Sequence, residues 1–173
     1  MHLISCGKPQ RAQLIRRIKM IINNTGKNFE KPDAGLFVGV LADVVDLGLK
    51  DYGYGPKLQI RLVWILNAKD KEGNYYRVAT QATGSLNEKA RLYKIVRDIL
   101  DAAPPVPFDI DFLIGKVNQL LIVREKSADG TKEYANVKAI IPATEGTVFA
   151  IPQGFIREKD KKQETGKTTP APA

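Results

Sequence analysis

The sequence contains almost no cysteine or histidine, and it has no long apolar run. Cys6 and His2 are the only residues of these two types among 173. An internal disulfide framework and a Cys/His zinc site are therefore excluded, and a single histidine argues against histidine-based catalysis. No apolar stretch reaches the roughly 20 residues of a membrane helix, and no signal-peptide pattern is present. We expect a soluble intracellular protein with no membrane partner.

The positive charge of the chain lies at its two ends. The formal net charge is +8, and residues 1–31 carry seven Lys or Arg against Glu30 alone. Residues 156–173 carry five Lys or Arg against three acids, so residues 32–155 are neutral on average. Basic composition alone therefore does not identify a nucleic-acid-binding protein. A binding site must come from local placement of cations and aromatic rings, or from the basic ends.

These differences divide the chain into a basic N-terminal extension (1–31), one folded domain (32–155) and a disordered polar tail (156–173). Residues 10–18, QRAQLIRRI, form a basic amphipathic stretch that suits a helix or a nucleic-acid-binding arm. The adjacent arginines Arg16 and Arg17 suggest a different interpretation, because purine-rich codons just before Met20 resemble a bacterial ribosome-binding site. We therefore hypothesise that translation begins at Met20 and that residues 1–19 are not native.

Five segments have the alternation and composition of β-strands, namely residues 35–47, 57–67, 75–83, 116–126 and 132–141. In the second segment, an apolar set that includes Trp64 alternates with a mixed set that includes Arg61. Between the third and fourth segments, Ser85 and Glu88 have the spacing of a capping box. This spacing predicts a helix over 86–102, which the prolines from Pro104 onward end. A short helical turn is expected within 108–115.

The order of these elements predicts the fold. Three strands, a helix and two further strands is the order of an OB-fold, a five-stranded barrel that binds oligonucleotides. We therefore predict a mainly β protein, a five-stranded OB-fold-like barrel with one helix between strands three and four and disordered termini. Another small α+β fold with a five-stranded sheet and one helix has the same order and remains an alternative.

A dispersed set of motifs over about residues 21–142 resembles one protein family. The motifs are NNTGKNFEKPDAGLFVGVLADVVDLG, LQIRLVWIL, SLNEKARLYK, LIGKVNQLLI and EYANVKAIIP. They are similar to those of bacteriophage and prophage single-stranded DNA-binding-like proteins with OB-folds. The start of the family falls near Met20, which independently favours translation from that residue. The chain departs from bacterial replicative single-strand binders at its end, where a Lys-rich stretch and TTPAPA replace an acidic tail with a hydrophobic tip.

The resemblance implies sequence-non-specific binding of single-stranded DNA during phage DNA replication or recombination. It places the protein in the cytoplasm of a bacterial host, with single-stranded DNA and phage replication or recombination proteins as partners. It implies no enzymatic activity, and we expect no cofactor or metal. The alternative is a phage protein-interaction or structural module that uses the same barrel for a protein partner.

A sequence-tolerant single-strand site needs aromatic rings on which bases stack and cations that contact phosphates. OB-folds supply both from the second and third strands and from the loops beside them. The residues that meet these requirements here are Tyr52, Tyr54, Lys57, Arg61, Tyr75 and Arg77, with Gln81 on the same face and Lys50 beside the loop.

Each candidate also has a purely structural interpretation. The two tyrosines of the loop can be ordinary loop aromatics, and the two arginines can pair with Asp70, Glu72 or Glu88. Tyr75 and its neighbour Tyr76 point to opposite faces of a strand, so at most one of them stacks on a base. Other residues are assigned first to structural roles: Trp64 to the core, Tyr134 to barrel closure, and Lys89, Arg91 and Lys94 to a solvated helix face.

Other chemistries are not supported by the motifs. Asp43, Asp46 and Asp51 match no calcium-loop spacing, and Asp109 and Asp111 are typical of a helix start. The segment GYGPK lacks the order of a phosphate-binding P-loop, and no base accompanies Ser85. Nucleotide hydrolysis and acyl transfer are therefore not expected.

Overall fold

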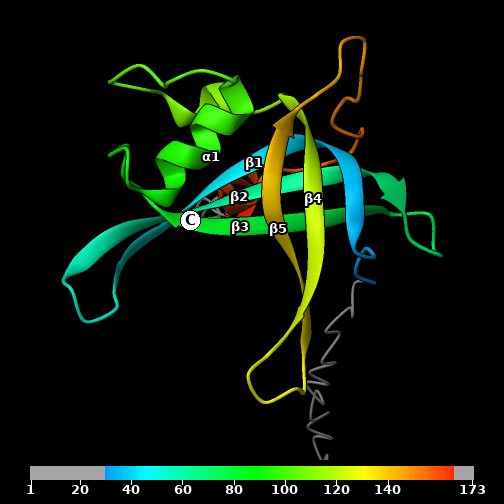
Figure 1. The fold of residues 1–173 in the computed structure, drawn as a ribbon, viewed down its shortest axis with the longest axis horizontal. Coiled ribbons are helices and arrows are strands. Elements are labelled where there is room, and N and C mark those ends of the chain that lie inside the picture. Colours follow the sequence, from blue (N-terminus) through cyan, green and yellow to red (C-terminus); the bar gives the residue numbers. More distant parts are fainter. Residues whose placement is uncertain (1–29, 166–173) are drawn as a thin grey trace, which may run out of the picture.

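Eight elements make up the part of the chain that the structure describes. The computed structural model describes residues 30–165 (Figure 1), so residues 1–29, with the hypothetical start at Met20, lie outside the described residues. In chain order the elements are β1 (Gly35–Asp51), β2 (Pro56–Lys69), β3 (Tyr75–Thr83), α1 (Arg91–Leu100), the 3-10 helix η1 (Ile110–Leu113), β4 (Val117–Lys126), β5 (Glu133–Pro142) and α2 (Glu158–Thr165). None of these helices is long and apolar enough to cross a membrane.

The five strands form one antiparallel sheet in the order β3-β2-β1-β4-β5. β1 is long and has two partners, because its first part pairs with β4 and its later part pairs with β2. Gly39 lies where β1 contacts both neighbours. A Cβ at this position would come within 2.8 Å of a Leu120 methyl carbon and 3.1 Å of a Leu66 methyl carbon, so a larger residue would require these buried side chains to shift. Figure 1 shows the result, with β4 and β5 running across the direction of β1, β2 and β3.

The sheet is open between β3 and β5. No ladder of hydrogen bonds joins these two strands within residues 30–165, although they approach each other and α1 packs against both. The mainly β class, the five strands and the helix between the third and fourth strands are confirmed. A closed barrel is not formed by hydrogen bonding.

Apolar side chains form a cluster on each face of the sheet. The main cluster lies between the sheet and α1 and contains Trp64, which is fully buried, so its assignment to the core is confirmed. A smaller cluster lies on the opposite face. It consists of Val40, Ala42 and Ile65, with the partly buried side chains of Tyr75, Val117, Phe149, Ile151 and Phe155 packed against it.

The helix is shorter than predicted because the capping box does not form. Ser85 Oγ accepts a hydrogen bond from the N–H of Asn87 (3.3 Å), and Asn87 Oδ1 accepts one from the N–H of Lys89 (3.0 Å). These bonds hold local turns that compete with helix, so α1 begins only after Ala90. It ends at Asp101, which has a left-handed backbone (φ 54°). The short turn expected within 108–115 is η1, which confirms that prediction.

The prediction of a disordered tail is wrong for residues 157–165. Arg157 forms ion pairs with the buried Asp43 (3.1 Å) and with Asp111 (3.2 Å), and α2 follows directly. The segment has little apolar character, but these long-range ion pairs hold it against the domain. Residues 143–157, here called the C-terminal strap, join β5 to α2 and pack across the sheet face that carries the smaller cluster. Residues 166–173 lie outside the described residues.

Candidate nucleic-acid interface

The β1–β2 hairpin extends from the domain as an arm, at the left of Figure 1. Near its end, Lys50 of β1 lies directly opposite Lys57 of β2. Two like charges opposite each other in a sheet repel, and neither lysine has an ion pair within the described part of the chain. The repulsion is relieved when an anion lies beside both ammonium groups.

The loop of this arm presents two aromatic rings to solvent. One carboxylate oxygen of Asp51 accepts hydrogen bonds from the N–H groups of Gly53 (2.8 Å) and Gly55 (3.1 Å) and so holds the loop. Tyr52 and Tyr54 are 70% and 88% exposed. Both rings can therefore contact a ligand without any rearrangement of the core.

Arg61 continues the cationic surface of the arm along β2. It lies four residues after Lys57 and therefore on the same face, about 13 Å away along the strand. Gln81 of β3 lies directly opposite Arg61 and is exposed. The four side chains of Lys50, Lys57, Arg61 and Gln81 are here called the cationic stripe.

The acidic residues proposed as partners of Arg61 and Arg77 are not their partners. Among residues 30–165, no ion pair involves either arginine. One oxygen of Asp70 accepts hydrogen bonds from the N–H groups of Glu72 and Asn74, both at 2.9 Å, and so stabilises the β2–β3 turn. The guanidinium of Arg61 thus remains available to an external anion.

Tyr75 and Arg77 lie further along the same face, where both contact the C-terminal strap; Tyr75 is half-buried there and Arg77 stays exposed. The rings of Tyr75 and Phe149 are 5.6 Å apart, and the Arg77 guanidinium lies 5.2 Å from the ring centroid of Phe155. Tyr76 packs against the main core instead, which confirms that the two adjacent tyrosines face opposite ways. The structure therefore divides the predicted site into two parts. The loop tyrosines and the cationic stripe lie away from the strap, and Tyr75 and Arg77 are in contact with it.

A second hairpin carries cations that the sequence prediction missed. Lys126 and Lys132 are exposed near the end of the β4–β5 hairpin, at the bottom of Figure 1. Tyr134 is also exposed, and Lys31 Nζ lies 5.5 Å from its ring centroid, so the assignment of Tyr134 to barrel closure is wrong. The sequence did contain a pattern that indicates these exposed residues. Polar and small residues alternate from Lys132 onward, which is typical of a strand with one face exposed to solvent.

The acidic residues of β1 each bind a different partner and do not form a cluster. Asp46 accepts a hydrogen bond from the N–H of Gly48 (2.7 Å), while Asp43 is held by Arg157. Asp109 accepts one from the N–H of Asp111 (3.0 Å), as expected of a helix-start acid. The residues that the structure describes hold no group of three acidic, His or Cys side chains arranged for a metal ion.

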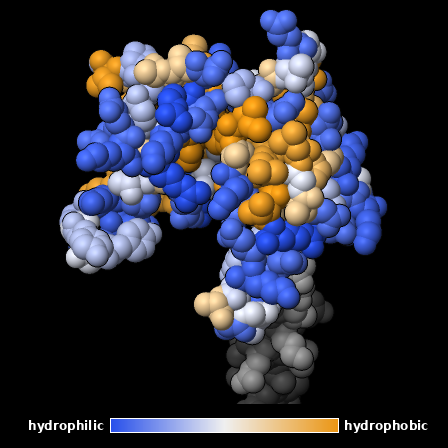
Figure 2. Space-filling model, viewed as in Figure 1, coloured by the Kyte–Doolittle hydropathy of each residue, from blue (hydrophilic) through white to orange (hydrophobic). Residues whose placement is uncertain are grey.

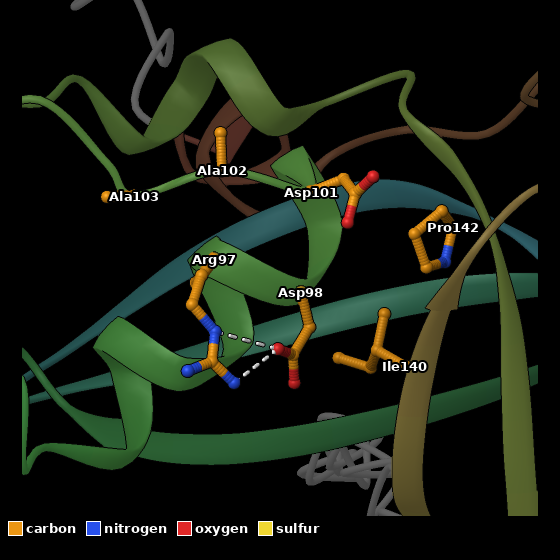
Figure 3. A pocket seen from close by; sticks show the side chains of 7 residues that line it. All are labelled: Arg97, Asp98, Asp101, Ala102, Ala103, Ile140 and Pro142. Atoms are coloured by element: carbon orange, nitrogen blue, oxygen red, sulfur yellow. Dashed lines mark hydrogen bonds and ion pairs between the residues drawn. The ribbon is translucent and has the colours of Figure 1, made fainter.

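Cavities are also present among the described residues. One of about 220 Å³ lies between the end of α1 and β5, and Figure 3 shows Arg97 bonded to Asp98 there rather than directed at a ligand. Another, of about 420 Å³, lies at the base of the arm between Leu58, Ile110 and Lys159. Leu58 points away from the cationic stripe, whereas Val45, which lies opposite Arg61, also lines this cavity.

An apolar patch covers part of the molecule in Figure 2, over the start of β1 and over β4 and β5. Leu36 of β1 and Ile141 of β5 are exposed apolar side chains of these strands. Leu121 and Gln119 of β4 lie opposite Leu36 and Ile141, respectively. This patch is separate from the cationic stripe, which lies on β1, β2 and β3.

Two comparisons with known proteins found no similar protein. Neither a scan against protein-family models nor a search of the curated proteins returns a match. The site must therefore be interpreted from its own chemistry: unpaired cations in a line, exposed rings beside them and an amide that can hydrogen-bond.

Proposed function

We propose that this chain binds single-stranded DNA without sequence specificity, through the cationic stripe and the two tyrosines of the arm. The observation that carries the proposal is the directly opposed pair Lys50 and Lys57, in line with Arg61 and without an acidic partner among the described residues. Phosphates placed along this line neutralise three cations and release their own counterions to solvent.

The exposed tyrosines favour a single strand over a duplex. Base–aromatic stacking contributes about 1 to 3 kcal/mol per base, and every base has a face that can stack, so it tolerates any sequence. In a duplex the bases stack on one another, which leaves Tyr52 and Tyr54 with no free base face. A single strand can place phosphates on the lysines and bases on these rings at the same time.

The topology supports an OB-like barrel as the scaffold. The order β3-β2-β1-β4-β5 leaves β3 and β5 as the two free edges, which approach each other beside α1. OB-folds bind oligonucleotides on strands two and three and on the loops that join strands one to two and four to five. In this chain those two loops are the ends of the two cation-bearing hairpins.

The family resemblance suggests the biological setting. We infer a role in phage or prophage DNA replication or recombination, in the cytoplasm of a bacterial host, where the protein protects single strands or presents them to replication or recombination proteins. Binding of this kind uses no catalytic group, cofactor or metal ion, so we propose no enzymatic activity.

The proposal is tested by fluorescence anisotropy with a labelled oligothymidine at low and moderate salt, with unlabelled duplex as competitor. We expect binding that duplex displaces poorly and that weakens with salt, with a log–log slope of about −0.7 for each phosphate contacted. Absence of binding at micromolar protein in low salt would refute the proposed function.

The alternative, a protein-interaction module, has one observation in its favour. An apolar patch lies over the start of β1 and over β4 and β5, where Leu36 and Ile141 are exposed, and contiguous apolar patches can mark interaction sites. It specifies no ligand chemistry, however, whereas the cationic stripe specifies an anion. Substituting Leu36 by Ser separates the two functions, because DNA binding through the stripe would be unchanged.

A further inference from the structure

The C-terminal strap covers the sheet face immediately beside the cationic stripe. Successive rows along β2 and β3 pair Arg61 with Gln81, then Val63 with Ala79, then Ile65 with Arg77. Asp43 of β1 lies opposite Val63, and it is there that Arg157 of the strap is bound. The strap therefore begins to cover the face one row after the stripe ends.

The contacts that the strap makes are of the kind that nucleobases make. Phe149 packs against the ring of Tyr75, and Phe155 lies under the Arg77 guanidinium. Aromatic stacking and cation–π contact are also how single-strand binders hold bases. Ile65, in the same row as Arg77, is buried beneath the strap and would be equally covered by a stacked base.

Side chains rather than backbone bonds attach the strap to this face. Within the described chain, the backbone hydrogen bonds of the strap are local, from Thr147 N–H to Thr144 and from Phe155 N–H to Pro152. Val148 is 88% exposed and so contributes nothing to the attachment. The strap is anchored at its C-terminal end, where the buried Asp43 accepts hydrogen bonds from Arg157 Nε (3.1 Å) and from the N–H of Glu158 (2.8 Å).

We propose that the strap is an internal competitor of the DNA strand: Phe149 and Phe155 occupy two base positions, at Tyr75 and Arg77, which a sufficiently long strand takes over. This inference rests on the proposed function and concerns the length of its site. Short strands bind the arm and the cationic stripe with the strap in place. Longer strands continue past Arg61, displace residues 143–156 and take over the contacts of Tyr75 and Arg77.

Limited proteolysis of the unmodified protein tests this directly. Chymotrypsin cleavage after Tyr54 and after Phe149 is followed by mass spectrometry, with oligothymidines of about 5 and about 15 nucleotides, within the range that single OB-folds bind. We expect both strands to slow cleavage after Tyr54. Only the longer strand should accelerate cleavage after Phe149, several-fold. Slower or unchanged cleavage after Phe149 with the longer strand bound would overturn the inference.

The two proposals fail in different ways in this experiment. If neither strand protects Tyr54 and neither binds in anisotropy, the proposed function itself is wrong. If Tyr54 is protected but Phe149 stays as resistant as before, DNA binds and only the competing role of the strap is wrong.

A variant gives a second readout. The double substitution Phe149→Ala with Phe155→Ala removes the competing rings, so affinity for the longer strand should rise several-fold while affinity for the shorter one stays the same. Val148→Ala is the matched control, because this strap residue is exposed. An equal change for both strand lengths, or none, would contradict the proposal, and Trp64 emission reports whether the fold is kept.

Discussion

At the scale of single residues, the basic side chains differ in whether the protein has already given them a partner. Arg124 and Arg157 each bind two carboxylates, and Arg91 donates a hydrogen bond to Thr80 (2.8 Å). Lys57 and Arg61 have no such partner among residues 30–165. Composition could not separate these two groups, because pairing depends on which acids the fold brings near.

Replacing Arg61 by Ala should weaken binding of oligothymidine and reduce the steepness of its salt dependence by about 0.7, the contribution of one phosphate contact. Lys94→Ala on α1 is the control, since it removes one charge from an exposed helix position. Anisotropy titrations at several salt concentrations measure both slopes. Equal slopes for the two variants would mean that Arg61 contacts no phosphate.

Trp64 is expected to act on stability rather than on binding, because its side chain is fully buried. Trp64→Ala should lower the free energy of unfolding by about 3 to 5 kcal/mol, the usual cost of such a cavity. Trp64→Phe should cost less, since the indole Nε1 has no hydrogen-bond partner in the described structure. Denaturant unfolding measures both. A stable Trp64→Ala protein that has lost DNA binding would instead identify Trp64 as a stacking residue.

At the scale of elements, strands were predicted well. β3 and β4 alternate between buried and more exposed positions, and β1, which is buried on both faces near its middle, is rich in Val and Leu. β3 has the predicted bounds, and the other four strands differ from prediction by a few residues at their ends. β1 was placed four residues too short, because the turn-like residues after Leu47 still pair with β2 and build the arm. The strap was missed entirely, since contacts such as Phe149 with Tyr75 join distant parts of the chain and leave no periodic pattern.

The arm should contribute stacking that salt does not change. Replacing Tyr52 and Tyr54 together by Ala should weaken binding by about 1 to 3 kcal/mol for each ring that stacks on a base. The slope of affinity against salt should stay the same, because no charge is removed. Anisotropy at several salt concentrations provides both values. Unchanged affinity would place base stacking elsewhere, for example at Tyr134 on the other hairpin.

The attachment of α2 should weaken in acid. A hydrogen bond from Lys159, together with the charges of Arg157 and Lys159, holds the pKa of Asp111 below its usual value. A carboxyl group whose pKa is lower in the folded protein than in the unfolded chain stabilises the folded state when it is ionised. This stabilisation is complete above the pKa of the unfolded chain, near 4, and it is lost as the pH falls through the pKa of the folded protein. The wild-type protein should therefore be more stable than Asp111→Asn at pH 7.

The stability difference between these two proteins should shrink as pH is lowered below about 4. Urea unfolding at a series of pH values, followed by Trp64 emission, measures it. A difference that is constant across this range would show that the charge of Asp111 contributes nothing to stability.

At the scale of the whole molecule, we propose that one face of the sheet is shared between a DNA strand and the protein's own C-terminal strap. The half near the arm is uncovered and cationic, and the other half is closed by the C-terminal strap. The sequence predicted the five strands and the single helix between the third and fourth strands, whereas the sheet that they form is open between β3 and β5. The division of this face into an uncovered half and a half beneath the strap was not predictable. It depends on the ion pair between Arg157 and the buried Asp43, which are more than a hundred residues apart in the sequence.

The central claim is that opposed lysines on the arm bind the phosphates of a single strand. Its most direct test compares the salt dependence of oligothymidine binding for the wild type, for Lys50→Ala with Lys57→Ala, and for the matched control Lys89→Ala with Lys94→Ala. The arm variant should lose about 1.4 from the log–log slope, two phosphate contacts, while the control keeps the wild-type slope. The same slope for all three proteins would contradict the claim.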